Sequence, residues 1–277
     1  MTRYAYLGPE GTHSHEALLA FAGPDALCEP VSTIGEVFKA VERGKAEMGI
    51  VPIENSVEGS VNATLDSLAF ESDLEIQAEV VRDIHHALCV APGTKLTDIT
   101  RIVSHPQALA QSRRWLTEHL LGKPVSAANS TAEAVRAAVE EPGVAAIGSM
   151  FAATTYGAEV LYESIEDYAG NQTRFVVLGN GIGARTGHDK SSLALFMKAD
   201  KPGTLHMILS EFAFWQINLT KIQSRPTRKQ LGDYMFFIDC VGHVEDENVR
   251  LALDCLRLKL RQVKVLGSYP RVAKDGS

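Results

Sequence analysis

The fold is decided by the stretch YAYLGPEGT (residues 4–12), in which a short apolar strand runs directly into a loop with two glycines. Apolar residues then recur at helical spacing over residues 15–21, so the order is strand, loop and helix. A strand followed at once by a helix is the repeating unit of α/β proteins. The stretch therefore predicts an α/β fold with a polar loop at the end of its first strand.

The same order returns further along the chain. Thr33 and Glu36 have the spacing of a capping box and open a helix that precedes an apolar strand. Ser130 and Glu133 repeat this arrangement. Alternating strands and helices predict parallel sheets covered on both faces, with ligands bound beyond the carboxyl ends of the strands.

Three polar loops follow apolar strands, at residues 8–12, 52–56 and 104–107, and we expect them at the ligand-facing edges. A fourth polar segment, NQTRF (residues 171–175), leads into another strand. Taken singly, each segment has an ordinary explanation as a helix cap or a turn. Together, their hydroxyl, amide and backbone N–H groups suit a small anionic molecule.

Residues 179–189 carry four glycines and almost no large apolar side chain, which indicates a linker. The elements predicted after it have the order βαββαβ of a ferredoxin-like plait. We therefore predict a first domain at residues 1–180 and a second at residues 190–272. The first is expected to hold two α/β subdomains, residues 1–77 with 165–180, and residues 78–164.

Composition excludes several classes of protein. A net charge of −7 argues against a nucleic-acid surface, which needs clustered cations. The four cysteines, Cys28, Cys89, Cys240 and Cys255, stand far apart, so we expect buried, reduced thiols and neither disulfides nor a zinc site. No signal-peptide core or membrane-spanning run is apparent, and we expect a cytoplasmic protein without a membrane or nucleic-acid partner.

Common catalytic motifs are also missing from the sequence. It contains no Gly-x-Gly-x-x-Gly, phosphate loop, His-Glu-x-x-His or Gly-x-Ser-x-Gly. Dinucleotide, ATP, zinc-protease and hydrolase functions therefore lose their main support.

Four strings in this order resemble the prephenate dehydratase family: GPEGT (8–12), PIENS (52–56), HPQALAQ (105–111) and NQTRF (171–175). The resemblance covers essentially the whole chain. It implies a catalytic region like a type II periplasmic binding protein, with two α/β subdomains and the active site in the cleft between them. The implied reaction converts prephenate to phenylpyruvate, water and CO2 in phenylalanine biosynthesis, a carbon–oxygen lyase reaction that needs no cofactor and no metal.

The resemblance also implies the roles of individual residues. Thr173 is the residue that the family requires for dehydration, as a hydroxyl that hydrogen-bonds the leaving oxygen. The implied catalytic residues are Thr173, Arg174, Asn55 and Ser56. The implied substrate-binding residues are Thr12, Glu54, His105, Gln107, Ser130, Thr131, Asn171 and Phe175. His13 departs from the family, which commonly has Phe at this position.

KPGTL (201–205) and INLTKIQSRP (217–226) resemble the two regulatory strings of the family's ACT domain. They imply allosteric control by phenylalanine and pairing of ACT domains in a homo-oligomer, a dimer or a dimer of dimers. The implied effector residues are Gly203, Thr204, Leu205, Asn218, Leu219, Ser224, Arg225 and Pro226. Thr204 and Gln223 replace the usual Ala and Glu, which leaves effector identity open. No chorismate mutase segment is expected, because the first strand already begins at Tyr4.

Two alternatives remain open from the residues. A solute-binding or sensing protein could use the same cleft without chemistry, although the missing secretion signal weighs against it. Arogenate dehydratase shares the motifs and accepts an amino group where prephenate has a keto oxygen.

Overall fold

The computed structural model describes residues 2–198, 201–227 and 234–272. The chain forms two compact units, one of Met1–Asn62 with Val80–Phe175 and the other of Ala63–Glu79 with Val176–Ser277. The catalytic and regulatory boundaries expected from the sequence stay predictions. No helix in the described part of the chain has the length and apolar character that crossing a membrane requires.

The first sheet has the strand order β2-β1-β3-β11-β5, with β4 paired to β3. The strands are β1 (Arg3–Leu7), β2 (Leu27–Val31), β3 (Met48–Asn55), β4 (Gly59–Ser60), β5 (Glu75–Asp83) and β11 (Gln172–Gly179). β1 pairs with β2 and with β3 in parallel. The helices of this region are α1 (His13–Ala22), α2 (Ile34–Glu42), α3 (Asn62–Asp66) and the π-helix η1 (Ser67–Glu71).

The capping box predicted for α2 is confirmed. The Thr33 side chain accepts from the N–H of Glu36, and the Glu36 carboxylate accepts from the N–H of Thr33. These bonds satisfy backbone donors that the first turn of a helix leaves free. Local sequence therefore fixes where α2 begins.

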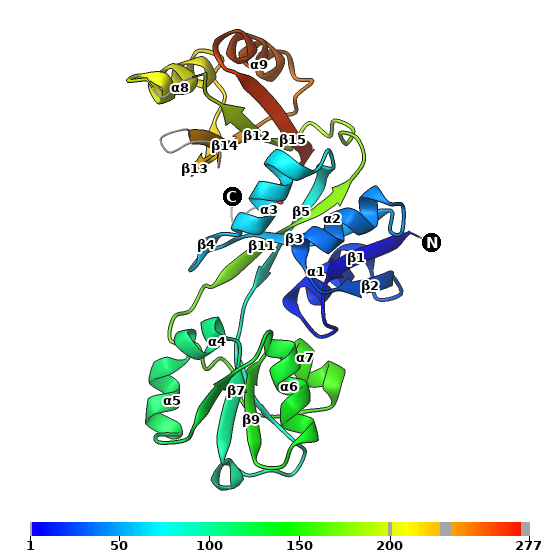
Figure 1. Cartoon of the computed structure of the whole chain (residues 1–277), viewed down its shortest axis with the longest axis vertical. Helices are drawn as coiled ribbons and strands as arrows, with labels where there is room; N and C mark the ends of the chain where they lie inside the picture. The colour runs from blue at the N-terminus through cyan, green and yellow to red at the C-terminus, as the bar shows by residue number, and fades with distance from the viewer. Residues whose placement is uncertain (1, 199–200, 228–233, 273–277) are drawn as a thin grey trace. The chain divides into compact units, whose positions relative to one another are not determined.

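The second sheet has the order β10-β6-β9-β7-β8. Its strands are β6 (Ala87–Val90), β7 (Arg101–Ser104), β8 (Val125–Ala127), β9 (Val144–Gly148) and β10 (Glu159–Tyr162). The helices are η2 (Leu96–Asp98, a 3₁₀ turn), α4 (Pro106–Gln111), α5 (Arg113–His119), α6 (Thr131–Glu140) and α7 (Met150–Tyr156). Figure 1 shows α4 and α5 on one face of this sheet and α6 and α7 on the other.

The second sheet corrects the expectation of purely parallel sheets. β7 pairs in parallel with β8 and β9, whereas β6 is antiparallel to both β9 and β10. Parallel neighbours need a crossover, usually a helix, to bring the chain back to the same end. β6 follows β5 after a short connection and is left through η2, so no α-helix stands on either side of it in the chain.

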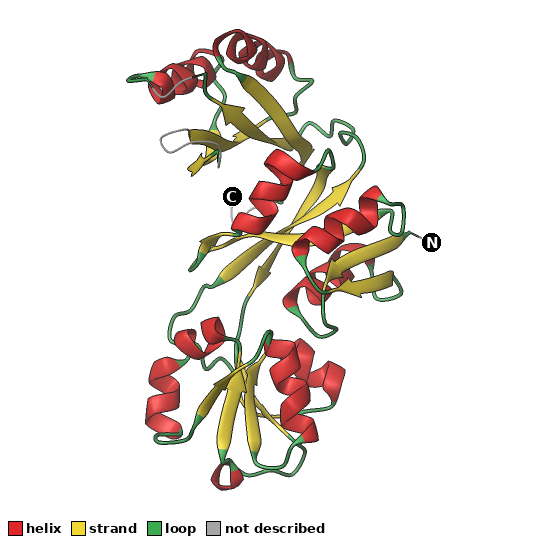
Figure 2. Cartoon of the chain, in the orientation of Figure 1, coloured by secondary structure: helices red, strands yellow, loops and turns green. Residues whose placement is uncertain are grey.

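The third sheet has the order β13-β14-β12-β15, and its pairs are antiparallel. Its elements are β12 (Asp189–Phe196), α8 (Thr204–Phe214), β13 (Leu219–Pro226), β14 (Tyr234–Val241), α9 (Glu247–Lys259) and β15 (Gln262–Pro270). The predicted βαββαβ order is confirmed. Figure 2 shows both helices on one face of the sheet, and Ile208, Phe212, Leu253 and Leu256 are buried there with Leu193 from β12.

Two predicted loops are largely strand. β3 continues to Asn55 because it pairs with β4, with Asn55 opposite Gly59. β11 likewise begins at Gln172, so Thr173 lies in a strand and not in the preceding loop. The end of β3 is set by a short hairpin with β4, whereas the start of β11 depends on its neighbours β3 and β5, which are far away in the sequence.

The cysteines are all free, but only Cys89 and Cys240 are buried. Cys28 and Cys255 are partly exposed, which corrects the expectation that all four are buried. Cys28 lies near the edge of its sheet, in β2, and Cys255 lies in α9. A position at a sheet edge or on a helix surface leaves one side of a residue uncovered.

Candidate active site

The larger compact unit contains a cavity of about 910 Å³. It is lined by residues from the first and second sheets and from the starts of several helices. Nine of the residues implied by the sequence line it: Thr12, Asn55, His105, Gln107, Ser130, Thr131, Asn171, Thr173 and Phe175. Glu54, Ser56 and Arg174 do not line it.

The alternation of side chains at the start of β11 divides the NQTRF string. Asn171, Thr173 and Phe175 line the cavity, whereas Arg174 does not. Successive side chains of a strand point to opposite faces, so Thr173 and Arg174 cannot both face the cavity. Arg174 instead makes an ion pair with Glu54, with Nη2 and Oε2 separated by 3.1 Å.

Two helix starts contribute N–H groups to the cavity. Thr12 caps α1 by accepting from the N–H of His15, and Ser130 caps α6 by accepting from the N–H of Glu133 at 3.0 Å. Both helices have ten residues, and their N-terminal ends carry partial positive charge. The second capping box is modified, because the Glu133 carboxylate accepts from the N–H of Asn129. These starts can hold carboxylates of a ligand.

Asn55 fixes the direction of the Thr173 hydroxyl. The Asn55 Oδ1 atom accepts from the N–H groups of Val57 and Glu58, both at 3.0 Å, so its Nδ2 must face the other way. Nδ2 donates to Thr173 Oγ1 and to Asn171 Oδ1, both at 2.8 Å. In the described part of the chain the Thr173 proton has no acceptor. The hydroxyl therefore accepts from Asn55 and can donate to a ligand.

The series of hydrogen bonds with fixed donors and acceptors continues from Asn171 through Gln111 to His86. Since Asn171 Oδ1 accepts from Asn55, its Nδ2 donates to Gln111 Oε1 at 3.0 Å. His86 Nε2 lies 2.9 Å from the same Gln111 oxygen and must donate to it. His86 therefore carries its proton on Nε2. Burial is the largest influence on this ring and lowers the pKa of His86, which favours the neutral form.

Ser56 joins two strands rather than lining the cavity. Its N–H donates to the Gln172 carbonyl at 2.8 Å, and its Oγ accepts from the Gln172 N–H at 2.9 Å. These bonds tie the end of β3 to the start of β11. Ser56 therefore helps to hold Asn55 beside Thr173.

Sequence reasoning missed several lining residues, among them His86, Gln111, Arg136 and Tyr156. Gln111 is the last residue of the HPQALAQ string, and its place in that string could have identified it as a site residue. Arg136 is the one Arg or Lys among the described lining residues. The Tyr156 hydroxyl donates to the Glu10 carbonyl at 2.7 Å, a contact between segments far apart in sequence.

A second pocket, of about 660 Å³, lies in the other compact unit. Gly203, Thr204, Leu205 and Ser224 line it, together with apolar side chains of the third sheet and α8. Asn218, Leu219, Arg225 and Pro226 do not line it. Arg225 instead makes two contacts of 2.5 Å with the Asp66 carboxylate, because alternation in β13 turns it away from Ser224.

The fold and the cavity define an α/β protein whose polar cavity, between helix starts and a positioned hydroxyl, suits a small anionic molecule. A sequence model of the family described as prephenate dehydratase matches residues 4–182. The chain belongs to the prephenate dehydratase family.

Three relatives show the extent of the similarity. The chain is 41% identical over 281 residues to a curated prephenate dehydratase of Mycobacterium bovis, covering 98% of this chain and 87% of the relative. A solved structure of prephenate dehydratase from Arthrobacter aurescens, in complex with L-Phe, has a TM-score of 0.90 at 38% identity over 97% of this chain and 90% of that one. Another, GqqA, described as a novel type of quorum quenching acylase, has a TM-score of 0.86 at 30% identity over 97% and 98%.

Proposed function

We propose that this chain converts prephenate to phenylpyruvate, water and CO2 in phenylalanine biosynthesis. The observation that carries the proposal is the Thr173 hydroxyl, which lines the cavity and accepts a hydrogen bond from Asn55 at 2.8 Å. Its own proton is therefore available to the departing oxygen of a ligand. Membership of the prephenate dehydratase family gives the same activity.

The reaction breaks two bonds of the substrate and consumes one proton. The bond from the ring to its carboxylate breaks, CO2 leaves, and the electron pair enters the ring. The carbon–oxygen bond opposite breaks, the oxygen keeps that pair, and with one proton it leaves as water. The aromatic ring that forms drives both cleavages. Protonation of the leaving oxygen is the step in which the protein can take part most directly.

We assign to Thr173 a directed hydrogen bond to the leaving oxygen. The proton that completes the water comes ultimately from solvent, because the Asn55 amide that donates to Thr173 cannot supply one. A threonine hydroxyl is a weak acid, so it works here through position and a directed hydrogen bond. Asn55 prevents the hydroxyl from turning its proton back into the protein. Arg174 and Ser56, which stand outside the lining, act by holding Glu54 and the start of β11.

The helix starts suit the carboxylates of the substrate. The N-terminal ends of α1 and α6 provide N–H donors in the cavity, and Ser130 and Thr131 add hydroxyl groups. Thr12 contributes as the cap of α1, since its hydroxyl donates to the Leu7 carbonyl. His105, Gln107, Asn171 and Phe175 complete the proposed binding residues. A strong clamp on the ring carboxylate would oppose its departure as CO2, so we place these donors on the side-chain carboxylate.

We further propose that residues 1–180 act as the catalytic region and residues 190–272 as an ACT domain that binds phenylalanine. The pocket beside Gly203, Thr204, Leu205 and Ser224 supports this, as does the L-Phe complex of the Arthrobacter protein. Asn218, Leu219, Arg225 and Pro226 do not line this pocket, and we propose that they support it by positioning β13, which carries Ser224.

We also propose a cytoplasmic homo-oligomer. β13 is an edge strand of its sheet and exposes Ile222, an arrangement that suits pairing with a second copy. Sedimentation of the purified protein with and without phenylalanine measures the oligomeric state.

One assay tests the function. The purified chain is mixed with prephenate or arogenate, and phenylpyruvate or phenylalanine is measured, giving kcat/KM for both. Release of phenylpyruvate from prephenate supports the proposal, and a higher kcat/KM on arogenate assigns the chain to that substrate instead. Binding without product makes it a sensor.

An acylase needs a nucleophile activated by a neighbouring base, and no hydroxyl among the described lining residues hydrogen-bonds a histidine side chain.

A further inference from the structure

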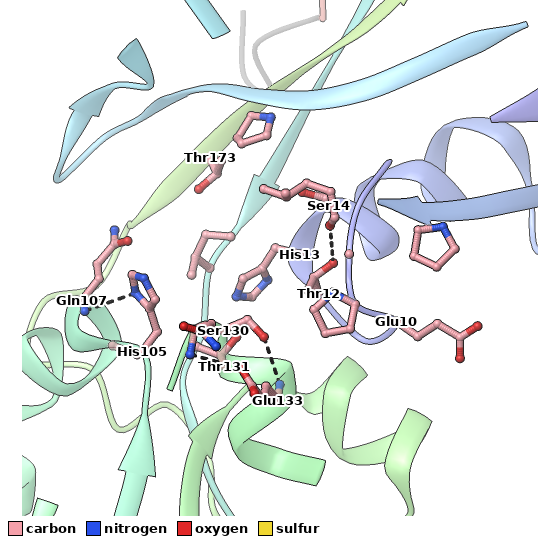
Figure 3. A pocket seen from close by; sticks show the side chains of 18 of the residues that line it. Glu10, Thr12, His13, Ser14, His105, Gln107, Ser130, Thr131, Glu133 and Thr173 are labelled. Atoms are coloured by element: carbon pink, nitrogen blue, oxygen red, sulfur yellow. Dashed lines mark hydrogen bonds between the residues drawn. The ribbon is translucent and has the colours of Figure 1, made fainter. Parts of the chain in front are cut away.

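His13 places a titratable ring inside the cavity. It is the first residue of α1, directly after the Thr12 cap, and it lines the cavity. Figure 3 shows its ring between Thr173 and the segment that carries Ser130 and Thr131. Both ring nitrogens are buried and have no hydrogen-bond partner among the described residues. A buried polar group without a partner is costly, which suggests that a ligand completes it.

A carboxylate stands behind the His13 ring. Glu16 Oε2 lies 3.6 Å from His13 Nδ1, an ion-pair distance that is longer than a hydrogen bond. Arg82 Nη2 holds the other carboxylate oxygen at 2.8 Å. The contact with His13 is the largest cause that lowers the pKa of Glu16, and Arg82 lowers it further against the effect of burial. Glu16 is therefore a fixed anion that does not itself line the cavity.

This arrangement orients the ring. A proton on Nδ1 faces Glu16, so Nε2 is the nitrogen left for a ligand. In the neutral ring with this tautomer, Nε2 is an acceptor and repels a carboxylate oxygen. In the protonated ring, Nε2 is a charged donor and attracts one.

Charged groups on two elements lie around His13. Glu16 on the same helix attracts a positive charge on the ring, whereas Arg82 on β5 and the partial positive charge at the start of α1 repel it. His86 before β6 is neutral and adds little. A dianionic ligand in the cavity adds a further attraction for that charge. Binding of an anion and protonation of the ring therefore favour each other.

We propose that His13 is a protonation-dependent ligand for a carboxylate of the substrate, oriented by Glu16 and Arg82. The inference rests on the proposed function, because it takes prephenate as the dianion. It assigns His13 to substrate affinity and leaves the hydrogen bond to the departing oxygen with Thr173. A phenylalanine ring at position 13 would fill similar space without supplying the charge.

The test is the pH dependence of KM for prephenate. We expect KM of the unmodified protein to rise about tenfold from about pH 6 to about pH 8.5, the worth of one hydrogen bond to a charged group, while kcat changes little. His13→Phe should hold KM near the high value across this range. Glu16→Gln should move the rise to lower pH, because the protonated ring loses its partner. His119→Gln, at an exposed ring on α5 that stacks on Trp115, is the matched control and should keep the original profile.

The outcomes separate the two proposals. An unmodified protein that makes no phenylpyruvate overturns the proposed function. Turnover with a KM that His13→Phe leaves pH-dependent overturns the inference alone, and so does a loss confined to kcat. If His13→Phe does not fold, the pH dependence of KM is measured for His13→Asn and Glu16→Gln instead. A pH dependence of KM that both variants leave unchanged overturns the inference.

Discussion

The active-site cavity and the second pocket are built in opposite ways. The cavity brings together polar side chains far apart in sequence, such as Asn55 and Thr173, which are 118 residues apart, and holds them by directed hydrogen bonds. The second pocket is formed within one βαββαβ unit, and Met197, Leu205, Leu209 and Phe236 give it largely apolar walls. Catalysis needs groups of fixed direction, whereas recognition of an effector needs shape and a few polar contacts.

The largest expected effect comes from removing the Thr173 hydroxyl, whose hydrogen-bond direction is fixed in the cavity. Thr173→Ala removes the proposed donor and should lower kcat on prephenate about 100- to 1000-fold, the usual cost of losing one transition-state donor. Thr173→Ser keeps the hydroxyl and should retain kcat within about tenfold. Steady-state assays with both variants check this, and an unchanged rate for the alanine variant would remove Thr173 from the mechanism.

A matched pair tests whether the hydrogen-bond chain has the assigned direction. Asn171→Asp replaces the Nδ2 donor by an oxygen that faces Gln111 Oε1, so the hydrogen bond between these two side chains should be lost. Gln111→Glu adds the same charge but keeps an acceptor for both Asn171 and His86, and the nitrogen it replaces has no hydrogen-bond partner among the described residues. We expect kcat of Asn171→Asp to be about tenfold below that of Gln111→Glu, the cost of a lost buried hydrogen bond. Equal values would mean that the chain has no preferred direction.

The second pocket should tolerate substitution without loss of basal turnover. Ser224→Ala removes a hydroxyl from the lining, and we expect the phenylalanine concentration for half-maximal effect to rise about three- to tenfold. Activity without phenylalanine should stay unchanged. Ser210→Ala is the control, since that exposed hydroxyl donates within α8 to the His206 carbonyl and has no other partner among the described residues. A response that Ser224→Ala leaves intact would place the effector elsewhere.

The smallest effect concerns stability and His86. Burial lowers the pKa of His86 in the folded chain below the ordinary value of 6.5, so between these values the unfolded chain binds the proton first. The free energy of unfolding should therefore be highest above pH 6.5 and fall as the pH drops through the folded-state pKa. His86→Asn, which can still donate to Gln111, should reduce this dependence in urea unfolding. A slope that the variant leaves unchanged would assign the dependence to other groups.

Local patterns predicted much of the fold. The capping residues of α2 and α6, the βαββαβ order and the polar strings around Thr12, His105 and Ser130 could be recognised because each depends on neighbours within a few residues. The reversed strand β6 could not, since its direction depends on how the chain enters the second sheet. Tyr156 and Arg136 were missed because nothing near them in sequence shows that they meet Glu10 or the cavity.

The sequence by itself determined which segments carry polar chemistry, and the family strings determined where Thr173 stands in the chain. Only the tertiary structure decided that Thr173 faces the cavity while Arg174 turns to Glu54, and that Asn55 holds the hydroxyl with its proton outward. It also placed His13, backed by Glu16, within the same cavity. The reason is physical: caps and helical periods are local, but the facing of a strand residue and the direction of its hydrogen bonds are set by pairing across the sheet.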